Sequence, residues 1–317
     1  MKNFDNKKKN LDNTLKQRRY FIDFLGGKLF LITTGLPFLV VIIMIIVLFI
    51  RTLPILSAKP LVDLLFGHVW LPLQGEFGFY PFLIGTLWVT LLAMIIAVPP
   101  CLLNAIYLSE YAHPTIRAFL KPLLDLLAGI PSVIYGVWGM ITIVPWVQTI
   151  TPDLGKWFGI EITNPTGYGI LSGGIVLAVM VAPVIISVAY EVMESVSHGF
   201  RQASLAVGAT KWQTVKFAVL PNAMPGIIAG IVLGFSRAFG ETMAVLMVVG
   251  NVAKVPNNIL DPAYPLTALI ANNYGEMMSI PLYDAALMGA SLLLLIVVLF
   301  FNLIAAFFLQ NALKQTL

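Results

Sequence analysis

The chain has 317 residues, of which 59% are hydrophobic and only 11% are charged, and its mean hydropathy is +0.90. Soluble globular domains usually carry about 25% charged residues, so this composition excludes a soluble protein, a disordered chain, a collagen and a disulfide scaffold. The single cysteine, Cys101, excludes an intrachain disulfide, and a net charge of +4 is weak grounds for nucleic acid binding. We therefore predict an all-α, polytopic membrane protein.

Six apolar segments have the length that a membrane crossing requires. A hydrocarbon core about 30 Å thick needs roughly 20 apolar residues in a helix. The first segment, Leu29 to Ile50, contains no charged residue and ends at Arg51. A short interfacial helix is expected after it, over 61–70. The other five spans are expected over 82–108, 123–147, 169–189, 224–249 and 285–309.

The basic residues indicate which side of the membrane is cytoplasmic. Six crossings place both termini on one side. That side receives most of the 19 Lys and Arg residues, because Arg237 falls within a span and the opposite side holds only Arg51, Lys59, Lys156 and Lys254. Cytoplasmic loops carry the excess of basic residues, so we predict a multi-pass protein of the cell (inner) membrane with both termini in the cytoplasm.

The same pattern divides the chain into three parts. We expect a basic cytoplasmic arm over 1–28, a six-helix transmembrane domain over 29–310 and a cytoplasmic tail over 311–317. The arm is interpreted as a solvated segment that sets the orientation, and the alternative is a surface for a partner.

Sequence signatures of an active site or a cofactor site are absent. The chain has no G-x-x-x-x-G-K-[ST] phosphate loop, no H-E-x-x-H, no C-x-x-C and no G-x-S-x-G. Its three histidines, His68, His113 and His198, fall in three different loops, which argues against a shared metal site. We therefore predict no catalytic residue, no metal and no bound cofactor in this chain.

The cytoplasmic stretch over 191–221 has the pattern of two short helices joined by a sharp turn. Gly208 can adopt the left-handed conformation that ends a helix. Thr210 can cap a second helix that starts near Lys211, and Pro221 suits the first turn of the next one. The apolar side chains of this stretch suit either the groove of a partner protein or the headgroup layer of the membrane.

The fifth span contains a pair of opposite charges, Arg237 and Glu241. Four residues separate them, so both are expected on one face of the helix. The same face carries small residues that let helices approach closely, namely Gly226, Gly230 and Gly234. The guanidinium fork of Arg237 suits a tetrahedral oxyanion. The alternative is an internal salt bridge with Glu241 that pins helix packing or gates a path.

The third span is interrupted by Gly129, Pro131 and Gly136. Pro131 removes one helical hydrogen bond, and backbone groups freed at membrane depth are tolerated where they face protein or a water-filled cavity. A helix that restarts after Pro131 would direct amide donors and the hydroxyl of Ser132 at such a cavity, which favours an anion. The alternative is a packing kink.

The stretch over 191–221 resembles the cytoplasmic coupling motif of ABC importer permeases. That motif has the order E-A-A, three residues, G, nine residues, I-x-L-P, and it docks on the ATPase subunit. The matching residues are Gln202, Ala203, Ser204, Gly208, Leu220 and Pro221, and Gln202, Ser204 and Ala218 stand where the motif has Glu, Ala and Ile.

Two further stretches are similar to signatures of phosphate-specific permeases. Residues 127–136 resemble the signature of their third span, and residues 234–245 resemble that of their fifth. Residues 243–251 are similar to the PstC type of the two permease subunits. The resemblance runs in the right order over 76–309.

The resemblance implies the transmembrane subunit of an ATP-driven importer of inorganic phosphate, in which Arg237, Glu241, Ser132 and Pro131 line or gate the path. The implied partners are a companion permease in a heterodimer, two ATPase subunits that hold ATP and Mg²⁺, an extracytoplasmic phosphate-binding protein and membrane lipid. The alternatives are an ABC permease for another oxyanion such as sulfate or molybdate, an ion-driven secondary carrier, and a non-transporting scaffold or sensor.

Overall fold

The computed structural model describes residues 2–159, 164–275 and 280–315, and most of them are helical. The α-helices are α1 (Lys2–Ala58), α2 (Leu61–Phe66), α3 (Tyr80–Ile106), α4 (Pro114–Ala128), α5 (Ser132–Trp138), α6 (Val144–Phe158), α7 (Ile170–Ser195), α8 (His198–Ala206), α9 (Lys211–Thr214), α10 (Leu220–Phe239), α11 (Met243–Leu246), α12 (Leu266–Asn273) and α13 (Pro281–Gln315). The other elements are the strands β1 (Trp70–Leu71) and β2 (Glu76–Phe77), the 3₁₀ turn η1 (Pro72–Gln74), and the π-helical turns η2 (Tyr107–Tyr111), η3 (Gly139–Ile143) and η4 (Val215–Val219).

The predicted number of membrane spans is confirmed within the described residues. Six helical stretches there are long and apolar enough to cross a membrane: Gly26–Ala58, Tyr80–Tyr111, Ser132–Trp157, Ile170–Ser195, Lys211–Phe239 and Leu282–Phe308. The predicted interfacial helix forms as α2, which is shorter than the expected 61–70. In the predicted C-terminal tail, α13 continues to Gln315, and residues 316–317 lie outside the described part.

The chain divides into two compact units, 1–51 and 52–317. The first unit belongs to α1, which runs without interruption through the predicted boundary at residue 28. Its apolar side chains are exposed on all sides of the helix; Phe30 and Leu31, for example, are 71% and 75% exposed. A helix that is apolar all round is typical of a membrane span, because lipid covers its surface.

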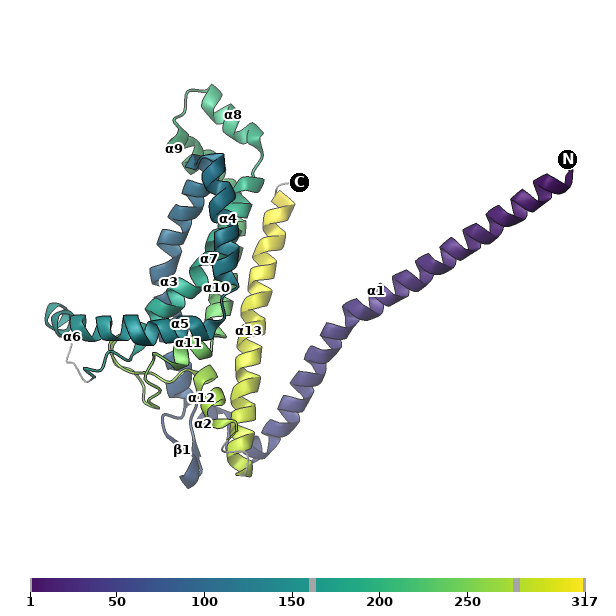
Figure 1. Cartoon of the computed structure of the whole chain (residues 1–317). Helices are drawn as coiled ribbons and strands as arrows, with labels where there is room; N and C mark the ends of the chain where they lie inside the picture. Colours follow the sequence, from purple (N-terminus) through teal and green to yellow (C-terminus); the bar gives the residue numbers. More distant parts are fainter. Residues whose placement is uncertain (1, 160–163, 276–279, 316–317) are drawn as a thin grey trace. The chain divides into compact units, whose positions relative to one another are not determined.

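Four long helices of the second unit, α3, α7, α10 and α13, run side by side (Figure 1). The contact between α10 and α7 is made at glycines. A Cβ atom placed on Gly226, Gly230 or Gly234 would lie 2.5 to 2.7 Å from valine and isoleucine side chains of α7. The two backbones therefore lie closer together than any larger residue would allow.

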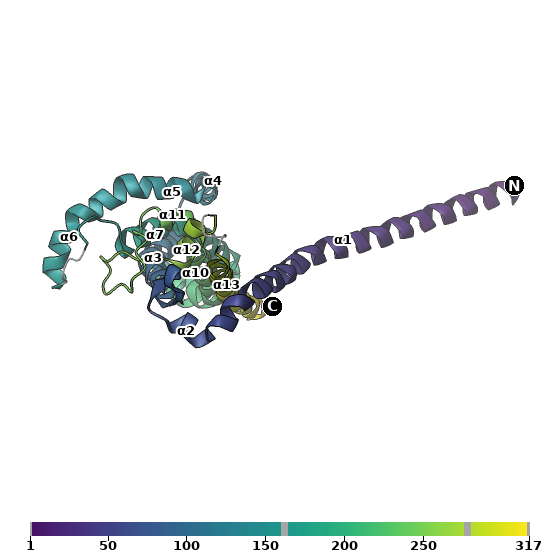
Figure 2. The ribbon, with the colours of Figure 1, turned by 90° about the horizontal axis from the view of Figure 1, so that it is seen from below.

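The predicted third span is divided into two separate helical segments. α4 ends at Ala128, and the helix resumes only at Ser132 and then continues through η3 to Phe158. Figure 2 shows α5 and α6 passing along the outside of α3 and α7. The predicted limits of 123–147 are therefore wrong, because Gly129 and the extended backbone at Pro131 (ψ 134°) separate α4 from the helix that follows.

The fifth span also ends earlier than predicted. α10 stops at Phe239, and after the non-helical Gly240 to Thr242 the short helix α11 begins at Met243. The predicted limit at Val249 is therefore wrong by ten residues. Residues 244, 245, 248 and 249 are nevertheless buried, because this segment turns back against the core formed with α7 and α5.

The two ends of the second unit carry different elements. At one end β1 and β2 pair antiparallel, with Trp70 opposite Phe77, and α2 and α12 lie nearby (Figure 1). An ion pair of 2.6 Å joins Lys59 Nζ to Glu76 Oε2 there. At the other end lie α8, α9 and the end of α13 (Figure 1).

The close packing of α10 on α7 makes Gly230 intolerant of a side chain. Gly230→Leu would place its Cβ 2.7 Å from Val188 Cγ1, and overpacking of this kind costs about 1–3 kcal/mol of stability. We expect the full chain, purified in detergent, to melt at a lower temperature than the wild type.

The matched control is Gly199→Leu, because Gly199 is exposed in α8 and its Cβ position makes only an ordinary contact of 3.5 Å with Ser197 Oγ. It makes the same gain in helix propensity without the clash. Equal melting temperatures for Gly230→Leu and Gly199→Leu would contradict the close packing of α10 on α7.

Candidate functional site

Arg237 lies in the last turn of α10 and reaches across to the end of α4. Its Nη2 donates a hydrogen bond of 3.3 Å to the carbonyl oxygen of Ala128, the last residue of α4. A cation at the C-terminal end of a helix is favourable, because the unpaired carbonyls there carry partial negative charge. The side chain is otherwise exposed in this single chain, so most of its donors are available.

Glu241 does not face Arg237 across one helical turn, which corrects the predicted geometry. The helix has ended two residues before Glu241, and the carboxylate turns to the start of α11, where Oε1 accepts a hydrogen bond of 3.3 Å from the amide of Ala244. Its backbone carbonyl accepts a bond of 2.8 Å from Thr267 Oγ1. Capping a helix start uses the negative charge locally, and no ion pair joins Glu241 to Arg237 among the described residues.

The interruption of the third span lies beside Arg237. Tyr135 Oη, one turn into α5, donates a hydrogen bond of 2.9 Å to the carbonyl oxygen of Leu127 on the other side of the interruption. Pro131 precedes α5 and Ser132 is its first residue, with a half-buried side chain. The two exposed helix ends are thus held together by one side-chain bond.

α11 packs on the first turns of α5. A Cβ atom on Gly136 would lie 2.8 Å from Met247 Sδ and 3.1 Å from Ala244 Cα, so the missing side chain is what permits this contact. The structure therefore brings the predicted path residues of the third and fifth spans to one place: the interruption at Pro131 and Ser132, the cation of Arg237, and the helix that Glu241 caps.

The stretch over 191–221 forms the predicted pair of short helices. Gly208 has φ +83°, the left-handed conformation, with open space around its Cβ position. Thr210 caps α9 in a capping box with Gln213, whose side chain accepts the amide of Thr210 at 2.8 Å. Ser204 Oγ lies 2.9 Å from Thr214 Oγ1 and ties α8 to α9.

The outer surface of these two helices is exposed and partly apolar. Gln202 and Ala203 are exposed, and Ser204 is half-buried against α9. Pro221 lies in the first turn of α10, next to the half-buried Leu220. Several large apolar side chains on this surface are more than half exposed: Leu205, Val207, Trp212 and Phe217.

Residues that no sequence motif marks attach α8 to the rest of the second unit. In the sequence, Arg201 is one of the basic residues on the predicted cytoplasmic side. In the structure its guanidinium forms an ion pair with Glu110, and the two side chains are only 14% and 8% exposed. The two residues lie 91 positions apart, and the only sequence signal was a carboxylate at the edge of an apolar segment.

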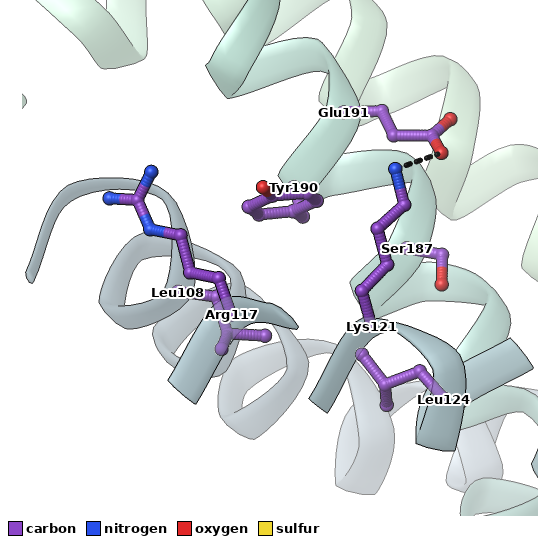
Figure 3. A pocket seen from close by; sticks show the side chains of 7 residues that line it. All are labelled: Leu108, Arg117, Lys121, Leu124, Ser187, Tyr190 and Glu191. Atoms are coloured by element: carbon purple, nitrogen blue, oxygen red, sulfur yellow. Dashed lines mark ion pairs between the residues drawn. The ribbon is translucent and has the colours of Figure 1, made fainter. Parts of the chain in front are cut away.

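A small cavity lies between α4 and α7 near the same end. Its lining includes Arg117, Lys121, Tyr190 and Glu191, with the ring of Tyr190 between the two basic side chains (Figure 3). Lys121 Nζ lies 3.7 Å from Glu191 Oε1. The cavity volume of about 10 Å³ admits at most one water molecule. We therefore interpret the cavity as a packing gap between α4 and α7.

Larger, open hollows lie at the hairpin end and in the loops after α11. One of about 470 Å³ is lined by Lys59, His68 and Glu76, and another of about 430 Å³ by Tyr168 and Asn251 with their neighbours. Among the residues that the structure describes, no group of three His, Cys, Asp or Glu side chains is placed to hold a metal ion.

Comparison with known proteins relates this arrangement to one family. The family model described as binding-protein-dependent transport system inner membrane component matches residues 102–315. The phosphate transport system permease protein PstC of Haemophilus influenzae is 33% identical, over 89% of this chain and 92% of its own length. PstC of Xylella fastidiosa (strain 9a5c) is 39% identical, over 68% of this chain and 69% of its own length.

A solved structure has the same fold. A chain of the MetNI methionine ABC transporter in an inward-facing conformation aligns with a TM-score of 0.52 over 77% of this chain and 97% of its own. The sequence identity is 20%, so this structural similarity supports only the assignment of the fold.

The hydrogen bond from Tyr135 to the carbonyl oxygen of Leu127 is expected to limit local opening of the segment between α4 and α5. Tyr135→Phe removes a buried hydrogen bond worth about 1 kcal/mol, which corresponds to roughly fivefold more frequent local opening. We expect those amides of Gly129, Ile130 and Ser132 that exchange slowly in the wild type to exchange correspondingly faster with deuterium. Tyr107→Phe, at an exposed tyrosine near the end of α3, is the control and should leave them unchanged. Unchanged exchange in Tyr135→Phe would show that this bond does not hold the interruption.

Proposed function

We propose that this chain, which belongs to the family of binding-protein-dependent transport system inner membrane components, is a permease subunit of an ATP-driven importer for inorganic phosphate. It is a multi-pass protein of the inner membrane and has no catalytic site of its own in this proposal. Phosphate as the substrate is supported by the names of the relatives, which are phosphate transport system permeases, and by the similarity of residues 127–136 and 234–245 to their signatures.

The observation that carries the proposal is the exposure of the Arg237 side chain and its lack of a carboxylate partner among the described residues. The guanidinium is exposed, its one hydrogen-bond partner among the described residues is a carbonyl oxygen at 3.3 Å, and Glu241 is turned away to cap α11. An arginine whose positive charge is not neutralised by a carboxylate suits an oxyanion, because the guanidinium fork offers several donors in one plane. We infer that phosphate competes with the Ala128 carbonyl for Arg237.

The same helix connects Arg237 to the exposed helix pair. Lys211–Phe239 is one helical stretch of 29 residues, or about 43 Å at 1.5 Å per residue, with α9 at its start and Arg237 in its last turn. A displacement of α9 is therefore transmitted along α10 to Arg237. Movement of Arg237 away from Ala128 would change the affinity for the anion, which is what alternating access requires.

The partners follow from the family and from the exposed surface. The family implies an ATPase and a substrate-binding protein. We propose that the coupling segment (191–221) presents α8 and α9 to a groove of the ATPase, with Gln202, Ala203, Ser204 and Gly208 at the contact. Two ATPase subunits would hold ATP and Mg²⁺, and a companion permease would complete the path beside Arg237.

The orientation is proposed from the positive-inside rule and from the arrangement of the second unit. The end of α13 lies at the same end as α8 and α9 (Figure 1), which supports a cytoplasmic C-terminus if the ATPase docks on these two helices. The excess of basic residues in the N-terminal arm supports a cytoplasmic position for this arm as well. The hairpin of β1 and β2 would face the phosphate-binding protein outside.

Replacing Arg237 tests the path. Arg237→Gln removes the charge, and a lost charge-assisted contact of about 1.5–3 kcal/mol lowers phosphate uptake roughly 10- to 100-fold. Glu241→Gln should impair uptake less, because its amide oxygen can still accept the amide of Ala244. Uptake of radioactive phosphate into cells is the measurement, and co-purification of the complex verifies assembly.

The control for charge loss is Lys156→Gln, at an exposed basic residue in the last turn of α6. It should leave uptake unchanged. Wild-type uptake by Arg237→Gln would remove Arg237 from the path.

The turn at Gly208 tests the coupling segment. Gly208→Val has room for the side chain, but a β-branched residue at φ +83° is strained by about 1–3 kcal/mol, so the turn between α8 and α9 shifts. We expect less ATPase to co-purify with the chain. Gly199→Ala, in α8 with only ordinary contacts, is the control. Undiminished association in Gly208→Val would show that this turn is not the docking site.

A further inference from the structure

Arg201 makes an unusually complete set of bonds for a residue on a short exposed helix. Nη2 lies 2.7 Å from Glu110 Oε1, and Nε lies 3.1 and 3.3 Å from the two carboxylate oxygens. Nη2 also donates to the carbonyl oxygen of Met193 at 2.7 Å, and Nη1 donates to that of Val196. One guanidinium therefore joins three elements: α8, the end of α7 and the end of α3.

The end of α3 has an irregular geometry that places two of its side chains against α8 and α9. The helix does not end regularly but widens into the π-helical turn η2, which carries Glu110 and Tyr111 next to each other. Glu110 contacts Arg201 of α8, and the ring of Tyr111 lies 4.8 Å from Lys211 Nζ of α9. Insertions of this kind are frequently found at functional sites, because they redirect side chains that a regular helix would space differently. Both short helices thus rest on the same turn.

Burial makes the pair selective for arginine and a carboxylate. The two side chains are 14% and 8% exposed, whereas the Lys121–Glu191 pair at the same end is 52% and 60% exposed and longer, at 3.7 Å. An exposed pair contributes little, but a buried charge that loses its partner is strongly unfavourable. A lysine at 201 would keep the charge and lose the fork that also reaches the carbonyls of α7.

We propose that the Arg201–Glu110 pair makes α3 move together with the coupling segment, and so transmits ATPase movement to a helix with which that segment has no covalent connection. α8 and α9 are continuous in the chain with α7 and α10 only. Without the pair, α8 is attached to the second unit through its two connections and its contacts to α9 and η4, and it can tilt without displacing α3. The inference rests on the proposed docking of the ATPase at α8 and α9, and Arg201 and Glu110 are positioning residues in it.

The test measures the distance between α3 and α8 by pulsed electron resonance. Spin labels are attached to cysteines at Leu103, exposed on α3, and at His198, the first residue of α8, with Cys101→Ala to remove the native thiol. The assembled complex in nanodiscs is measured with and without ATP. In the wild type we expect one narrow distance that ATP leaves unchanged. In Glu110→Gln we expect ATP to shift or broaden it, and the phosphate transported per ATP hydrolysed to fall several-fold.

The control is Glu191→Gln, which removes the exposed carboxylate of the neighbouring pair and should behave as the wild type in both measurements. If Glu110→Gln does not assemble, Arg201→Lys is measured in its place, with the same expectation. An unchanged distance in the variant, or failure of both variants to assemble, overturns the proposal, because the pair is then dispensable or needed only for folding. The distance requires no phosphate, so a wild-type complex that does not transport phosphate would contradict the proposed function without deciding this inference.

Discussion

The second unit depends on the close approach of α10 to α7 at Gly226, Gly230 and Gly234. Without Cβ atoms at these positions the two backbones can touch, which replaces the hydrophobic effect as a source of helix association in lipid. The contact fixes the direction of the long helix that begins at α9 and ends at Arg237. α9 at one end and Arg237 near the other therefore belong to one continuous helical stretch, Lys211–Phe239.

Arg201 and Arg237 differ in how many partners the second unit supplies to their guanidinium groups. Arg201 receives a carboxylate and two carbonyls, and its side chain is almost fully enclosed with that of Glu110. Arg237 receives one carbonyl and stays exposed. The contrast supports the proposed positioning role of Arg201 and the proposed binding role of Arg237. Most donors of Arg201 are already bonded, and an arginine at membrane depth is costly unless it meets a partner.

Much of the fold could be predicted from local patterns. Apolar length predicts the six spans, and a glycine followed by a capping threonine predicts the turn between α8 and α9. The position of Glu241 could not be predicted, because spacing assumes that the helix continues and the carboxylate instead caps a new one. The Arg201–Glu110 contact escaped prediction because it joins residues 91 positions apart, which only packing brings together.

ATP-driven phosphate transport is tested most directly in proteoliposomes that contain this chain, a companion permease and the ATPase, with the phosphate-binding protein outside and ATP inside. A proton ionophore abolishes any proton gradient. The account predicts that radioactive phosphate accumulates with ATP in the presence of the ionophore and does not accumulate without ATP. Accumulation that continues without ATP on an imposed proton gradient, and that the ionophore abolishes, would contradict it.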